Sequence, residues 1–174
     1  GPFGIVQVSL PPGDTLPALQ SGAIDAAEFA GPSSDLALGF HRAARFYYGP
    51  GLHEPNGTGE CIVNRRAFEG LPAHLQAVVV EACRAENSFA LAEAEMTNAA
   101  ALRSLVADHG VELRSFPLEI TEALRTQAPA VLGQFVVAGG LDKRIHDSYV
   151  AMLDLLRPWS RESMASFLAA RAAA

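Results

Sequence analysis

The sequence lacks any long run of apolar residues, because Arg, Glu or Asp interrupts every apolar stretch before the roughly 18–20 residues that a membrane-spanning helix needs. No membrane-spanning helix is therefore predicted. Basic residues are scarce: 13 Lys+Arg face 19 Asp+Glu, Lys143 is the single lysine, and the formal net charge is −6. A chain without a basic cluster lacks the surface that nucleic acids require, which excludes that class of partner.

Common catalytic signatures are also missing. The sequence has no G-x-S-x-G, no G-x-x-x-x-G-K, no G-x-G-x-x-G and no H-E-x-x-H. Its five histidines are scattered without a close pair, which disfavours a transition-metal site built from local spacing. Cys61 and Cys83 have no C-x-x-C spacing, and their apolar neighbours predict small buried side chains.

Short apolar segments separated by Gly and Pro occupy residues 1–70. The segments that predict strands are 3–10, 23–30, 46–48 and 60–64, and those that predict helices are 15–21 and 33–44. Because short strands alternate with helices, the fold class predicted for this region is α/β, and residues 1–70 are predicted to form one lobe segment, for which the family resemblance given below implies ligand binding.

Residues 71–110 have a different character, with no Gly before Gly110 and a single Pro at position 72. Apolar residues recur at helical intervals, which predicts one long spanning helix of more than about 50 Å. Two helices with a kink near Asn87 are the alternative. Residues 111–174 predict a short edge strand over 111–116 followed by C-terminal helices.

The run Ala23–Ala30 sets two acids into an apolar segment. In a strand, Glu28 would share an apolar face with Ile24 near the strand's carboxyl end, where open α/β sheets bind ligands. A carboxylate there needs compensation, and a hard cation such as Na⁺ or Ca²⁺, bound also by a neighbouring backbone carbonyl, would supply it. An outward-facing Glu at the end of a strand is the alternative.

The run Phe46–Pro55 joins aromatic rings to a Gly/Pro-rich loop that carries His53 and Glu54. Such a combination can form one wall of a site for a small polar ligand. In the alternative interpretation, the rings belong to the core and His53 and Glu54 lie in a solvated turn.

Three motifs carry a family resemblance: A-L-Q-x-G-x-I-D-A-A-E, G-P-x-x-D-L-A-L-G and Y-Y-x-P-G-x-H-E-P. With these motifs the chain resembles the solute-binding proteins of TRAP (tripartite ATP-independent periplasmic) transporters. Within that family it looks like the branch that binds 2-oxo acids. The resemblance covers nearly the whole chain, but roughly the N-terminal half of the family pattern is missing.

The resemblance implies a periplasmic receptor with two α/β lobes that closes on a carboxylate ligand. This chain would be its C-terminal lobe, with a long spanning helix and a C-terminal helical arm. Glu28 matches the acidic cation ligand, and Phe29 matches the residue whose carbonyl binds the same ion, although relatives usually have Trp there. Glu54, with His53 beside it, falls where a further ligand contact is expected.

The resemblance also implies which partners the chain has. They are a small organic-acid anion, a bridging Na⁺ or Ca²⁺, the membrane subunits of the transporter, and a second copy bound through the long and C-terminal helices. The arginine that pairs with the ligand carboxylate belongs to the missing half. Two alternatives stay open: an α/β enzyme with Glu54 or Glu28 as general base beside His53, and a helical dimerisation module.

Overall fold

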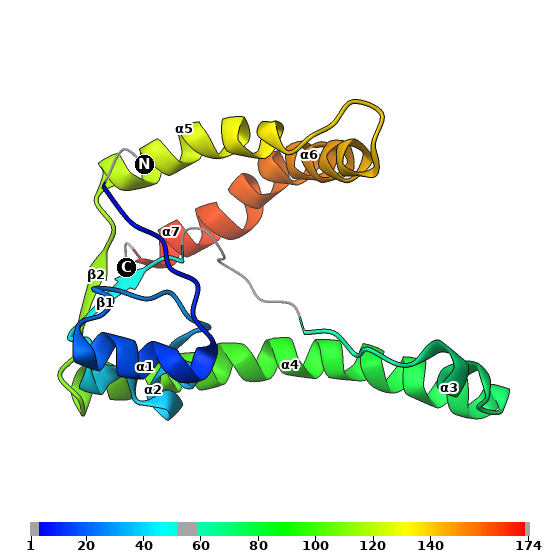
Figure 1. Cartoon of the computed structure of the whole chain (residues 1–174), viewed down its shortest axis with the longest axis horizontal. Coiled ribbons are helices and arrows are strands. Elements are labelled where there is room, and N and C mark those ends of the chain that lie inside the picture. Colours follow the sequence, from blue (N-terminus) through cyan, green and yellow to red (C-terminus); the bar gives the residue numbers. More distant parts are fainter. Residues whose placement is uncertain (1–3, 52–58, 173–174) are drawn as a thin grey trace. The chain divides into compact units, whose positions relative to one another are not determined.

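The computed structural model describes residues 4–51 and 59–172, shown in Figure 1. The chain divides into two compact units, Gly1–Phe116 and Pro117–Ala174. No helix within the described residues is long and apolar enough to cross a membrane. The segment boundaries at residues 70 and 110, which were predicted from the sequence, stay a prediction.

Glycines end the first helices of the chain. Helix α1 (Pro12–Ser21) begins with a proline in its first turn and ends at Gly22, which has a φ of 72°. Helix α2 (Pro32–Leu38) ends in the same way at Gly39, with a φ of 80°, and a 3₁₀ turn, η1 (Phe40–Arg42), follows. The helix predicted over residues 33–44 is thus split in two, because left-handed backbone at Gly39 cannot continue an α-helix.

The long helix is unbroken. Helix α4 (Ala73–Ala107) has 35 residues, so the prediction of one spanning helix is confirmed and the kinked alternative is wrong (Figure 1). A short helix, α3 (Arg65–Glu69), precedes it, and the Asn64 side chain caps α3 by accepting the amide of Ala67 at 3.1 Å. Cys61 and Cys83 are both exposed, so the prediction that they are buried is wrong.

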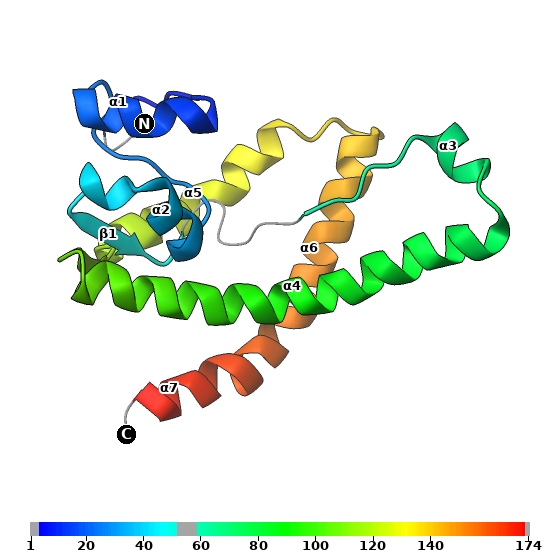
Figure 2. The same ribbon diagram turned by 90° about the horizontal axis from the view of Figure 1, so that it is seen from below.

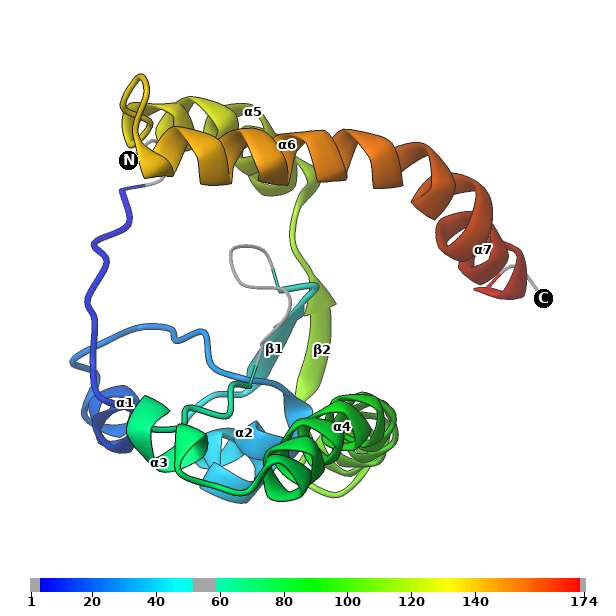
Figure 3. The same cartoon turned by 90° about the vertical axis from the view of Figure 1, so that its right-hand side faces the viewer.

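Two short strands form the sheet. Strand β1 (Phe46–Gly49) pairs in parallel with β2 (Glu112–Ser115), as Figure 3 shows, and α4 lies in the crossover between them. The strands predicted over 4–10, 23–30 and 60–64 are wrong, since these described segments have no strand structure. Extended backbone becomes a strand only beside a partner for its hydrogen bonds, and within the described residues these segments have none.

The core of the first unit is small and lies near the C-terminal end of α4. Helix α2 packs against this part of α4, side by side in Figure 2. Among the described residues, the buried apolar side chains are Phe40, Ala101, Leu105 and Val111. The backbone amide of Val111 donates to the carbonyl of Leu105 at 3.0 Å, which turns the chain from α4 into β2.

The described part of the second unit consists of helices, with a short non-helical connection between α5 and α6. Helix α5 (Leu118–Gln134) contains the predicted pattern 118–127 and the first part of the predicted pattern 131–137, and it ends before residues 135–137. Helix α6 (Leu141–Ser160) continues through Pro158, and a π-helical turn (Arg161–Ala165) connects it to α7 (Ser166–Ala172), as seen in Figure 3. The described parts of these helices bury no side chain within the chain.

Candidate functional site

The segment between α1 and α2 lines a hollow of about 830 Å³, which we call the Glu28 hollow. Its other walls come from α2, from β1 and from α4. Glu28 and Phe29 both line it, so the structure brings together the two residues that the resemblance implicates. The environment predicted for Glu28 is wrong, because Glu28 is exposed on a segment without strand structure instead of lying on the apolar face of a strand.

Phe29 fixes this segment to the lobe. Its ring makes an edge-to-face contact with the ring of buried Phe40, with 5.0 Å between the centroids. Glu28, the residue before Phe29, is exposed, whereas Phe29 is half-buried. No backbone amide of the described residues donates to the Phe29 carbonyl, and its lone pairs therefore stay available.

A second anchor follows Phe29 in the chain. Both the backbone amide and the hydroxyl of Ser33 donate to Oδ1 of Asn98 in α4, at 3.0 and 2.8 Å. Gly31 passes so close that a Cβ there would lie 3.4 Å from the same oxygen. Helix α4 thus holds the end of the segment that carries Glu28.

We expect Asn98→Ala to lower the free energy of unfolding by about 1–3 kcal/mol, because the Ser33 amide loses its partner in a half-buried place. Asn87→Ala is the matched control, since Asn87 is exposed on the same helix and should change stability by less than about 0.5 kcal/mol. Denaturant unfolding of the two variants measures the difference. Equal destabilisation by both would show that Asn98 does not anchor the segment.

Asp35 and Tyr47 join α2 to β1 in the wall of the hollow. The Tyr47 hydroxyl donates to Oδ2 of Asp35 at 2.6 Å. Burial raises the pKa of Asp35, and the bond from Tyr47 opposes this shift. Burial also raises the pKa of Tyr47, which keeps its phenol protonated as the donor. Sequence reasoning missed this pair, although the acid of the motif G-P-x-x-D and the aromatic patch were both visible.

The charge that lines the hollow is mostly negative. The described lining contains three acids, Asp25, Glu28 and Asp35, and one cationic side chain, Arg45. Arg45 is already paired with Glu112. Arg114 also binds Glu112 at 2.8 Å, and this hydrogen bond is the main reason that the pKa of Glu112 is lowered. An anion would therefore meet little unpaired positive charge on this wall.

A hard cation fits these donors. The described residues hold no cluster of three or more His, Cys, Asp or Glu side chains, so a metal site cannot consist of side chains of these residues alone. The Glu28 carboxylate and the Phe29 carbonyl are oxygen donors, which suit Na⁺ or Ca²⁺ and leave positions for oxygens of a ligand or water. His53 and Glu54 lie outside the described residues.

An α/β lobe with an oxygen-lined hollow beside a long helix is the architecture of a solute-binding protein. The family model of bacterial extracellular solute-binding proteins, family 7 (DctP), matches residues 2–137. The chain therefore belongs to this family, which confirms the family predicted from the sequence.

One curated relative is the monocarboxylate 2-oxoacid-binding periplasmic protein of Nostoc sp., which is 33% identical over 162 residues. The match covers 93% of this chain and 44% of the relative. The chain thus spans about half the length of the proteins that it matches.

Three solved TRAP periplasmic solute-binding proteins share the fold. The protein of Colwellia psychrerythraea, with bound calcium and pyruvate, matches with a TM-score of 0.84 and 30% identity, over 96% of this chain and 51% of its own. The protein of Bordetella bronchiseptica, a mixed-occupancy dimer with calcium and picolinate, matches with a TM-score of 0.85 and 31% identity. This match covers 99% of this chain and 51% of the Bordetella chain. The protein of Pseudoalteromonas atlantica, with bound sodium and pyruvate, matches with a TM-score of 0.77 and 26% identity. This match covers 92% of this chain and 49% of the Pseudoalteromonas chain.

Proposed function

We propose that this chain is the C-terminal portion of a TRAP-type solute receptor that binds a small organic-acid anion together with a cation. The ligand class is a 2-oxo acid or a related monocarboxylate. The observation that carries the proposal is the Glu28 hollow, where an acid and an available backbone carbonyl lie side by side in the sequence on an anchored segment. Relatives of the same fold hold calcium or sodium with pyruvate or picolinate.

The cation resolves an electrostatic conflict. Among the described residues, the wall carries three acids and one paired arginine, which would repel an organic-acid anion. A cation bound by Glu28 and by the Phe29 carbonyl reverses the local charge and offers its remaining coordination positions to the ligand carboxylate. This mode of binding needs no free arginine on this lobe.

The remaining contacts are assigned as part of the same proposal. Phe29 also forms the ligand-facing wall, and a ring smaller than the usual Trp leaves more room there. Glu54 and His53 are proposed to contact the ligand from the loop after β1. A charge-assisted contact to the ligand carboxylate would come from an arginine of the other lobe, and closure of the two lobes would complete the site.

The proposed receptor works outside the cytoplasm. Family membership and the Nostoc relative support a periplasmic location, with delivery of the ligand to membrane subunits of a transporter. The chain would release its ligand chemically unchanged, without catalysis. A homodimer through the long and C-terminal helices is supported by exposed apolar side chains on α4 and α6. These side chains include Leu91, Met96, Ile145 and Met152.

Titration calorimetry on the complete receptor tests the proposal. Pyruvate or picolinate should bind when Ca²⁺ or Na⁺ is present, and binding should weaken by at least about 10-fold when a chelator or exchange into potassium-free, sodium-free buffer removes the cation. The bound acid should be recovered intact. Cation-independent binding, or turnover of the acid, would refute the proposed mode.

A further inference from the structure

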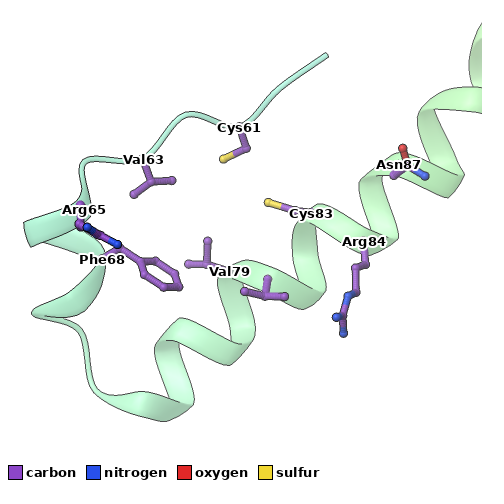
Figure 4. Close-up of a pocket in the computed structure, with 9 residues that line it drawn as sticks. Cys61, Val63, Arg65, Phe68, Val79, Cys83, Arg84 and Asn87 are labelled. Carbon is purple, nitrogen blue, oxygen red and sulfur yellow. The ribbon is translucent and has the colours of Figure 1, made fainter. Parts of the chain in front are cut away.

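The two cysteines face each other across a second hollow, of about 600 Å³, which lies at the opposite end of α4 from the core. We call it the thiol hollow. Its walls are the segment after residue 59, helix α3 and the first half of α4. Figure 4 shows the Cys61 side chain on the side of its segment that faces α4, and the Cys83 side chain on the side of α4 that faces the segment. Nothing in the proposed ligand site uses either residue.

The backbone geometry explains why the sulfurs meet. Segment 60–64 is extended, so Cys61 and Val63 project to the same side. On α4, Val79 and Cys83 are four residues apart and share one face. Figure 4 shows Val63 over Val79 and Cys61 over Cys83, because the segment runs in the opposite direction to the helix.

The two thiols also influence each other. The pKa of the Cys83 thiol is raised, and the main cause is its hydrogen bond with Cys61. Both thiols are exposed, so an oxidant can reach them. Arg65 and Arg84 line the same hollow, and each is paired with a neighbouring acid of its own helix.

We propose that Cys61 and Cys83 form an intramolecular disulfide that ties segment 60–64 to α4. A metal site is disfavoured at this place, because the described residues hold no cluster of three or more metal-binding side chains. The bond would anchor the chain a few residues after His53 and Glu54 in the sequence. It would also close a loop of about 20 residues and so restrict the unfolded chain.

The reaction is a thiol–disulfide exchange with an oxidant of the disulfide class. One cysteine thiolate attacks a sulfur of the oxidant, forms a mixed disulfide and displaces the first reduced thiol. The second cysteine thiolate then attacks the protein sulfur of the mixed disulfide and displaces the second reduced thiol of the oxidant. Two electrons pass to the oxidant, and the two protons of the cysteines end on the released thiols. The periplasmic location proposed above would supply such an oxidant.

The test uses the purified chain with oxidised glutathione as the oxidant and no ligand. After alkylation of remaining thiols and digestion, mass spectrometry should find one linked peptide pair that contains Cys61 and Cys83. Cys61→Ser and Cys83→Ser should each leave one thiol that takes up glutathione or alkylating reagent. Separate glutathione adducts on both cysteines of the wild type, or a dimer linked between chains, would overturn the proposal.

A second measurement asks whether the bond fits the native fold. The oxidised protein should melt about 5–10 °C above the reduced one, and neither serine variant should show a redox-dependent change. A melting temperature that falls on oxidation would show that the bond strains the structure and would overturn the proposal as well. Because no ligand is present, neither result depends on the proposed receptor function.

Discussion

Replacing Glu28 with Gln is expected to weaken binding of the organic acid by about 100-fold or more in the presence of the cation. Gln keeps the size of the side chain but removes the negative charge that would hold the ion. Loss of supporting residues around a metal site typically costs about 10–100-fold in affinity, so loss of a direct ligand should cost at least as much. Calorimetry with Ca²⁺ or Na⁺ and pyruvate measures the effect.

Asp25→Asn is the matched control for Glu28→Gln. Asp25 is exposed, lines the same hollow and lies three residues earlier on the same segment. Because the interaction of an exposed charge is screened over about 8–10 Å by salt, its removal should change affinity by less than about threefold. Wild-type affinity in Glu28→Gln, or an equal loss in both variants, would remove Glu28 as a cation ligand.

A thermal experiment separates the cation from the organic acid. In the wild-type receptor the cation alone should raise the melting temperature, since a ligand that binds only the folded state stabilises it. In Glu28→Gln this increase should disappear, and in Asp25→Asn it should persist.

The largest effect on stability is expected from Leu105→Ala. Leu105 is the most deeply buried apolar side chain of the described residues, with 2% of its surface exposed. Its truncation leaves a cavity in the small core near the C-terminal end of α4 and should cost about 2–5 kcal/mol of unfolding free energy.

Leu91→Ala provides the comparison on the same helix. Leu91 is 68% exposed, and its truncation in this chain should cost less than about 0.5 kcal/mol. Denaturant unfolding of the two variants with the wild type gives both values. If Leu91→Ala destabilised the chain as much as Leu105→Ala, the core would not lie where α2 meets α4.

Local patterns predicted the elements that depend on local energetics. Helix α4 was predictable because 35 residues keep helix-favouring composition without an internal Gly or Pro. The end of α1 was predictable because Gly22 adopts left-handed backbone at little cost. Strands over 23–30 and 60–64 were predicted wrongly, because apolar alternation marks extended backbone but does not supply the neighbouring strand.

The exposure of the cysteines shows the same limit. Apolar neighbours in the sequence suggested burial, yet Cys61 and Cys83 lie on an exposed face, because burial depends on what else packs there. The sequence also did not indicate that both cysteines line one hollow, because this requires segment 60–64 to run back along α4. The charge balance around Glu28 likewise followed only from knowing which acids line one hollow.

The acidic, lysine-poor composition, the three motifs and the long helix were determined by the sequence alone, and they sufficed to predict the family to which the chain belongs. Only the tertiary structure decided how the segment that carries Glu28 is anchored and that Glu28 is exposed. Its segment is held by the ring of Phe40 and by Asn98, which accepts two hydrogen bonds from a residue 65 positions away. The physical reason is that propensity acts between neighbours along the chain, whereas anchoring, exposure and the charge of a cavity arise between residues that only folding brings together.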